Sequence, residues 1–187
     1  MANLTEVDWS NIPAPEDDGG AAHLTGMQMP PVPLPGTDGS LVDLSALGGL
    51  SVVYAYPMTG RPDVPLPDGW DMLPGARGCT PQSCAFRDHY AELSNLGVDH
   101  LFGLSVQSTD YQREAASRLH LPFPLLSDEG HELLTALSLP TLESDGMTLL
   151  KRLTLMIRDG QIVHVLYPVF PPDRNADDVV DWLRSQA

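Results

Sequence analysis

The chain has 187 residues, of which 42% are hydrophobic and 19% charged, proportions that are ordinary for a globular protein with its own core. Ten Lys and Arg against 25 Asp and Glu give a formal net charge of −15, which disfavours nucleic acid and anionic membrane surfaces as partners. No apolar run approaches the roughly 20 residues of a membrane helix, and the acidic N-terminus does not resemble a secretory signal, so we expect a cytoplasmic protein.

The first part of the chain predicts a short lead-in followed by β structure. Residues 1–30 are rich in Pro, Gly and Asp, and we expect an N-terminal arm or flexible tail before a single domain over 31–187. Alternating apolar and polar residues over 32–47, around a Thr-Asp-Gly turn, predict a hairpin. The β-branched and aromatic run at 50–57 predicts a central strand. Four prolines and four glycines within 58–78 then predict an unusually long loop.

The middle of the chain predicts alternating helices and strands. Apolar residues at helical spacing predict one helix that begins at Pro81, with Thr80 as its N-cap, and ends at Gly97. A strand at 98–106 follows, and then a helix over 109–120. The second helix is expected to begin with a capping box, because a Thr at its first position is followed three residues later by a Gln.

The last third predicts a short strand at 123–128 and a short helix at 131–137. Two strands joined by Asp159-Gly160, a strong hairpin signal, are expected over 152–169. An amphipathic helix capped by Asn175 closes the chain. This order predicts an α/β protein with a thioredoxin-like fold, in which helices flank a central mixed β-sheet.

The two cysteines, Cys79 and Cys84, both lie at the predicted start of a helix. Open α/β sheets bind ligands at the carboxyl ends of their strands, and the loop 58–78 leads from the predicted central strand directly to Cys79. Unpaired backbone N–H groups and the positive end of the helix dipole stabilise a thiolate at this position, with Arg77 nearby as a second positive charge. Cys84 is further into the helix, so the two thiols are not equivalent.

The spacing of the cysteines is unsuited to a permanent disulfide. Five residues of ideal helix place two Cα atoms roughly 8.7 Å apart and about 140° around the axis, whereas a disulfide needs Cα atoms within about 6.8 Å. A bond between them therefore requires the first turn to unwind. Such a pair suits a transient disulfide that forms after one thiol is oxidised.

Several segments together resemble the peroxiredoxins, specifically the bacterioferritin-comigratory or Q-type subfamily. The resemblance covers roughly residues 32–185. It is carried by "YP" at 56–57, "GCTPQSCAFRDHYAEL" at 78–93, "LGVDHLFGLSVQS" at 96–108, "LPFPLLSD" at 121–128 and "RLTLMIRDGQI" at 152–162.

The resemblance implies a thiol-dependent peroxidase, an atypical 2-Cys enzyme that reduces hydrogen peroxide and organic hydroperoxides. Cys79 would be the peroxidatic cysteine that becomes a sulfenic acid, Cys84 the resolving cysteine of an intrachain disulfide, and Arg152 the cation beside the thiolate. Thioredoxin or a similar dithiol would be the reductant, the protein would be a monomer, and no cofactor would be needed. Gln82 stands where many members of the subfamily carry Glu.

The chain departs from the family in the loop that precedes the first cysteine. The family pattern is P-x-x-x-T-x-x-C, but Pro57 lies 22 positions before Cys79, which is an excess of 15 residues. Ala76 occupies the position of the family threonine, which binds the attacking sulfur and the peroxide. We therefore expect Pro57 and either Thr59 or Thr80 to contribute to peroxide binding, within a long inserted active-site loop.

Other interpretations of the cysteines remain open. They could be inert buried thiols, although their place at a helix start favours redox chemistry. A thiol-disulfide oxidoreductase normally uses C-x-x-C, whereas four residues intervene here. A non-enzymatic redox sensor is the third class. Since His89 with the two cysteines lacks any recognised zinc spacing, we expect no metal.

Overall fold

The computed structural model describes residues 7–187, and its core is a five-stranded sheet in the order β5-β4-β3-β8-β9. β3, β4 and β5 run parallel, whereas β8 pairs antiparallel with β3 and with β9. The strands are β3 (Leu50–Ala55), β4 (His100–Ser105), β5 (Leu125–Ser127), β8 (Leu153–Arg158) and β9 (Gln161–Leu166). The mixed sheet, its central strand and the hairpin at Asp159-Gly160 were all predicted correctly.

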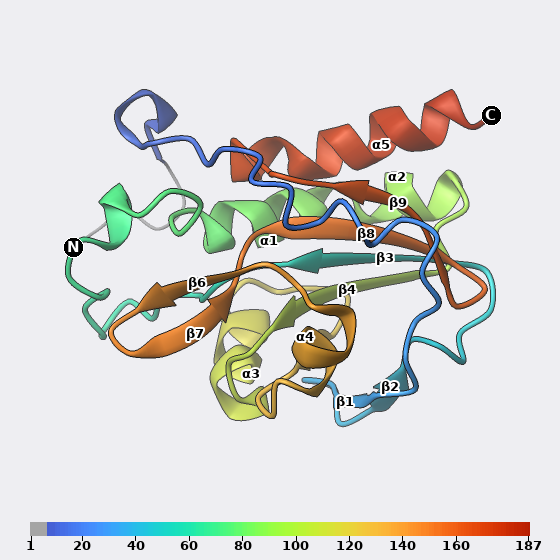
Figure 1. The fold of residues 1–187 in the computed structure, drawn as a ribbon, viewed down its shortest axis with the longest axis horizontal. Helices are drawn as coiled ribbons and strands as arrows, with labels where there is room; N and C mark the ends of the chain where they lie inside the picture. Colours follow the sequence, from blue (N-terminus) through green and yellow to red (C-terminus); the bar gives the residue numbers. More distant parts are fainter. Residues whose placement is uncertain (1–6) are drawn as a thin grey trace.

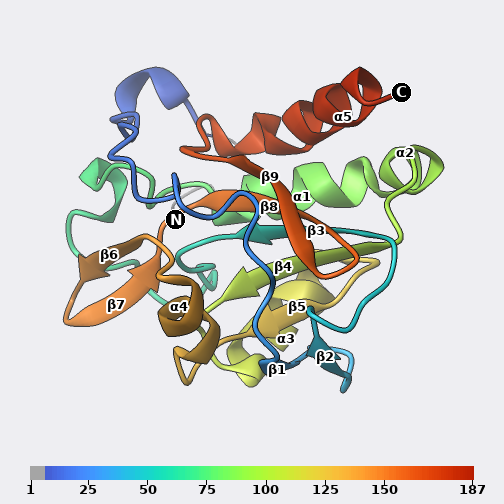
Figure 2. The same ribbon diagram turned by 45° about the vertical axis from the view of Figure 1, so that its right-hand side comes forward.

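Helices lie on both sides of this sheet (Figures 1 and 2). α1, α2 and α5 cover one face, α4 lies on the other, and α3 packs beside the edge strand β5. The helices are α1 (Cys79–Asp88), α2 (Tyr90–Asn95), α3 (Thr109–Arg118), α4 (Glu132–Leu137) and α5 (Asn175–Ser185). No helix in the described part of the chain has the length and apolar character that crossing a bilayer requires.

Side chains of β3 alternate between two apolar cores, because successive residues of a strand point to opposite faces. Val52 and Tyr54 join the core beneath α1 and α5, whereas Val53 and Ala55 join the core on the α4 side. The ring of Tyr54 stacks on Phe86 of α1, with the ring centroids 4.3 Å apart. A strand buried on both faces thus fixes α1 on the sheet.

Two small hairpins lie outside the main sheet. β1 (Pro33–Pro35) pairs with β2 (Leu41–Asp43), which confirms the N-terminal hairpin. β6 (Thr141–Ser144) pairs with β7 (Met147–Leu150), and this hairpin was not predicted. Its signal was an Asp-Gly turn at 145–146, where both residues adopt the left-handed conformation that favours glycine.

The chain before β1 covers the outer edge of β9. The N–H of Gly26 donates to the carbonyl of Ile162 at 2.7 Å, and the N–H of Met29 donates to that of Gly160 at 2.8 Å. Leu24 and Met29 are buried in the core on the α4 side. Residues 26–29 thus protect an edge strand. The part of the predicted arm before residue 7 lies outside the described residues, and the proposed domain boundary at 30 stays a prediction.

The predicted helix from Pro81 to Gly97 is wrong at its start and in its middle. α1 already begins at Cys79, its N-cap is Gly78 in the left-handed conformation, and Thr80 lies inside the first turn. Pro81 is tolerated there because the N–H groups of the first turn have no partner within the helix. His89 then separates α1 from α2, with φ −91° and ψ 1°.

Two predicted caps are also wrong. The N-cap of α3 is Ser108 rather than Thr109, because the Ser108 hydroxyl accepts from the N–H of Tyr111. The N-cap position of α5 is Arg174, and Asn175 lies inside the helix with its side chain buried. The side-chain amide of Asn175 instead accepts hydrogen bonds from neighbouring elements. The preference of Asn for the N-cap position does not predict these contacts.

The long loop over 58–78 is irregular, as predicted, apart from one short 3-10 turn at Trp70–Met72. It is attached to the domain at several points. The guanidinium of Arg118 donates to the carbonyl of Gly60 at 3.0 Å. The indole of Trp70 is buried in the core on the α4 side. The loop is therefore a packed part of the domain.

Candidate active site

The candidate site lies where the first turn of α1 meets the carboxyl end of β3. Cys79 is the first helical residue and is only 4% exposed. Gly78 before it adopts φ +110°, and a Cβ there would lie 2.6 Å from the ring of Trp9 and 2.7 Å from Pro172. Only glycine fits this conformation in this space. The crowding fixes the backbone that presents the Cys79 sulfur.

Arg152 brings a positive charge to the sulfur. It directly precedes β8, is 2% exposed, and places Nη2 3.3 Å from the Cys79 Sγ. The same nitrogen lies within 3.2 to 3.3 Å of three backbone carbonyls, those of Gly75, Ala76 and Arg77. The loop that leads to Cys79 thus holds the guanidinium against the thiol.

A chain of neutral polar groups supports Arg152 from the opposite side. Its Nη1 donates a short hydrogen bond to Oε1 of Gln82, which is fully buried on α1. Nε2 of Gln82 donates to Oδ1 of Asn175 at 2.9 Å, and the hydroxyl of Thr154 donates to the same oxygen at 2.7 Å. The network joins α1, β8 and α5. Sequence reasoning missed Asn175 and Thr154, whose roles depend on contacts between distant segments.

The charge of Arg152 is not balanced by a carboxylate. Within residues 7–187, no Asp or Glu forms an ion pair with it, and its hydrogen bond to α1 goes to the neutral amide of Gln82. A buried guanidinium with neutral partners favours an anion beside it, since removal from water strengthens the electrostatic interaction. The Cys79 sulfur, in contact with Nη2, is the group that can supply this anion.

Cys84 lies on the same helix in a different environment. The side chain is half-buried, and both cysteines are free thiols. Burial raises the pKa of the Cys84 thiol, and the nearby charge of Arg87 only partly opposes this effect. α1 is continuous over both residues, so the first turn must open before their sulfurs can bond.

We expect the raised pKa of Cys84 to control its alkylation. Because the thiolate is the reactive form, iodoacetamide should modify Cys84 in the reduced protein with a midpoint above the ordinary thiol value of about 8.5. The pH profile of modification, read by peptide mass spectrometry, measures this midpoint. Unfolding in urea should return it to the ordinary value, and an unchanged midpoint would remove burial as the cause.

Of the three other predicted site residues, Thr80 lines the crevice at the sulfur, whereas Thr59 and Pro57 make contacts with Gln107 and Ser105. Thr80 is buried and lines a narrow crevice together with Cys79 and Pro81. Thr59 donates from its N–H and its hydroxyl to Oε1 of Gln107, at 2.9 and 3.1 Å. The carbonyl of Pro57 accepts from the Ser105 hydroxyl at 3.1 Å. The structure therefore brings Cys79, Arg152 and Thr80 together.

This arrangement suits nucleophilic chemistry at sulfur. A buried thiol at a helix start, in contact with a guanidinium, can act as a nucleophile toward an electrophile in the crevice. No group of three or more His, Cys, Asp or Glu side chains in the described chain is arranged to hold a metal ion. The chemistry available from these side chains is that of the thiol and its cation.

Comparison with known proteins gives a consistent result. The family model described as Redoxin matches residues 24–180. Peroxiredoxin Q, chloroplastic, of Sedum lineare is 32% identical over 162 residues, which cover 86% of this chain and 77% of that protein. Peroxiredoxin Bcp of Escherichia coli (strain K12) is 32% identical over 166 residues, which cover 84% of this chain and 94% of that protein.

Solved structures agree on the fold. The crystal structure of peroxidoxin BcpB from Mycobacterium tuberculosis matches with a TM-score of 0.70 and 25% identity, over 88% of this chain and 99% of that one. PrxQ from Xylella fastidiosa also gives a TM-score of 0.70, at 19% identity, over 88% of this chain and 98% of that one. The predicted thioredoxin-like fold is confirmed.

Proposed function

Because the chain belongs to the peroxiredoxin family, in the Bcp/PrxQ subfamily, we propose that it is a thiol-dependent peroxidase acting on hydrogen peroxide and organic hydroperoxides. The observation that carries the proposal is the contact of Arg152 Nη2 with the Cys79 Sγ, at 3.3 Å in a buried site. Cys79, Arg152, Pro57, Thr59 and Thr80 are the proposed site residues of the peroxide reaction.

In the first step, the Cys79 thiolate attacks one oxygen of the peroxide and the O–O bond breaks. The sulfur is oxidised to a sulfenic acid, and the other oxygen leaves as water or alcohol after it takes a proton from the solvent. Negative charge moves from sulfur to the leaving oxygen, and the guanidinium of Arg152 stabilises it throughout. We propose that the hydroxyl of Thr80, which lines the same crevice, binds a peroxide oxygen.

In the second step, the Cys84 thiol attacks the Cys79 sulfenic acid, a disulfide forms and water leaves. A dithiol such as thioredoxin then reduces the disulfide to two thiols and is itself oxidised. The resolving thiol lies on the same chain, so no second subunit is needed, and we propose a monomer. A cytoplasmic location fits this cycle, because the reductants there keep thiols reduced.

Intact mass after one equivalent of hydrogen peroxide tests both steps. The oxidised wild-type protein should be lighter by about 2 Da, since two thiol hydrogens are lost when one disulfide forms. The Cys84→Ser variant should instead gain about 16 Da, the mass of the oxygen in a sulfenic acid. Oxidation that yields only crosslinked dimers would reject resolution within one chain.

Turnover distinguishes the two alternative functions. A peroxidase consumes many equivalents of peroxide when a dithiol is present. A thiol-disulfide oxidoreductase would instead reduce a protein disulfide such as that of insulin, and a sensor would react with peroxide once and stop. Sustained peroxide consumption, without insulin reduction, is the result expected here.

A further inference from the structure

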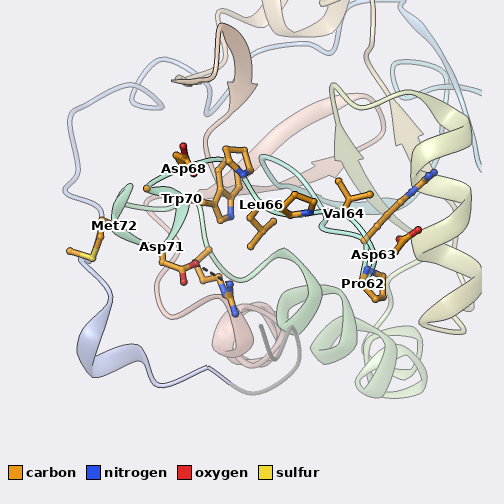
Figure 3. A pocket seen from close by; sticks show the side chains of 13 residues that line it. Pro62, Asp63, Val64, Leu66, Asp68, Trp70, Asp71 and Met72 are labelled. Carbon is orange, nitrogen blue, oxygen red and sulfur yellow. Dashed lines mark hydrogen bonds and ion pairs between the residues drawn. The ribbon is translucent and has the colours of Figure 1, made fainter. Parts of the chain in front are cut away.

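The long loop before Cys79 forms a cavity of its own (Figure 3). The cavity has a volume of about 470 Å³ and is lined only by residues 61–72 and by Arg77. This volume is within the range of small-molecule sites, roughly 300–1,000 Å³. All of its walls belong to the segment that contains the excess residues relative to the family pattern.

The cavity shares part of its lining with the crevice that holds Cys79. Leu66, Trp70 and Arg77 line both spaces. The crevice itself offers only about 10 Å³, enough for about one water-sized group. One oxygen of a peroxide fits in this space, but an organic substituent does not. The substituent must therefore lie outside the crevice, and the adjoining cavity is the space that shares its walls.

The cavity presents apolar side chains to the solvent. Val64 is 45% exposed and Met72 is 66% exposed, and both line the cavity. Only three large apolar side chains of residues 7–187 are at least 45% exposed, and two of them line this cavity. Figure 3 shows Trp70, Leu66 and Val64 in succession along the wall. Covering such side chains with an apolar ligand is favourable.

Contacts near both ends of the loop fix its shape. The guanidinium of Arg61 lies 4.2 Å from the centre of the Tyr111 ring on α3. At the other end, Arg77 forms an ion pair with Asp71 at 2.9 Å, drawn as a dashed line in Figure 3. Prolines along the loop further restrict its backbone. Little ordering is therefore needed when a ligand enters.

The charges of the cavity favour an uncharged ligand. Two arginines, Arg61 and Arg77, line it together with three aspartates, Asp63, Asp68 and Asp71. Arg77 is already paired with Asp71, so the cavity offers no excess positive charge to an anionic tail. The chain as a whole carries a formal charge of −15, which disfavours anions further.

We infer that this cavity binds the organic substituent of neutral, apolar hydroperoxides while their O–O group enters the crevice at Cys79. The inference rests on the proposed peroxidase function and names its preferred substrate class. The Cys79 thiolate takes the terminal oxygen, becoming a sulfenic acid, and the O–O bond breaks. The substituent departs as an alkoxide that takes a proton from water and leaves the cavity as an alcohol.

Single-turnover oxidation of the reduced protein, without any reductant, tests the inference. The probes are cumene hydroperoxide and hydrogen peroxide, and the quantity compared is the ratio of their second-order rate constants. In the double variant Val64→Thr/Met72→Gln, which keeps the charge and nearly the size of the side chains, this ratio should fall by about tenfold, because apolar contacts are lost. Both side chains are exposed, so the variant should fold.

Leu41→Gln is the matched control, because Leu41 is 70% exposed but lies on β2, away from the cavity. It should leave the ratio unchanged. An unchanged ratio in the double variant would overturn the inference, whether the two rate constants stay constant or fall together. A loss seen only in steady state with thioredoxin would also overturn it and assign the surface to the reductant. If neither peroxide oxidised the wild-type protein, the proposed function would itself fail.

Discussion

Replacing Cys79 with serine is expected to reduce peroxide consumption to the background level of the buffer. The serine hydroxyl is not ionised beside Arg152 at neutral pH, so no nucleophile of comparable strength remains in the crevice. The substitution is nearly isosteric in a site that is 4% exposed, and the fold should persist. Consumption of hydrogen peroxide with an excess of dithiol gives the measurement.

Cys84→Ser is the matched control for this experiment, since it removes the other thiol of the same helix. It should retain a single turnover at nearly the wild-type rate and then accumulate the sulfenic acid. The difference in first-turnover rate between the two variants identifies which thiol reacts with the peroxide. Loss of the first turnover in Cys84→Ser, with full activity in Cys79→Ser, would reverse the assigned roles.

Arg152→Ala is expected to slow the reaction with peroxide by a factor on the order of 10², as expected when a preorganised partner of transition-state charge is removed. The guanidinium contacts the sulfur and also holds the carbonyls of Gly75, Ala76 and Arg77. Both the charge and the loop position are therefore lost. Stopped-flow rates at several pH values should show the loss, together with weaker alkylation of Cys79 at neutral pH.

Two controls separate the charge from the fold. Arg152→Lys keeps a positive charge but lacks the planar fork, so we expect an activity between those of the wild type and Arg152→Ala. Arg113→Ala removes an exposed arginine from α3 and should change neither rate nor alkylation. If thermal unfolding shows Arg152→Ala to be folded and its rate equals that of the wild type, the charge has no part in catalysis.

The regular elements could largely be predicted from the sequence, because their signals are local. The apolar run of β3 and the Asp159-Gly160 turn depend on neighbouring residues only. The start of α1 was misplaced because Thr80 and Pro81 resemble a cap and a first helical residue. The actual cap, Gly78, is selected by crowding from Trp9 and Pro172, which are distant in sequence.

The candidate site could also be predicted only where its signals are local in the sequence. The cysteines and Arg152 were predicted as site residues from their positions and from the family resemblance, and the structure brings Arg152 into contact with the sulfur of Cys79. The amide chain from Gln82 to Asn175 was not found, because Asn at the start of a helix normally indicates a cap. In this protein, contacts with Gln82 and Thr154 determine the role of the Asn175 side chain. The cavity of the inserted loop also depends on packing that no local pattern encodes.

The continuity of α1 over both cysteines has a consequence for electron flow. A disulfide between them exists only after the first turn has opened, so the reduced form is stabilised by every contact that this turn makes. Stabilising the dithiol makes the reduction potential less negative, by about 30 mV for each 1.4 kcal/mol. In the proposed cycle, this shift favours electron transfer from thioredoxin, whose potential is about −270 mV. Refolding of the helix would then contribute part of the driving force for reduction of the proposed disulfide.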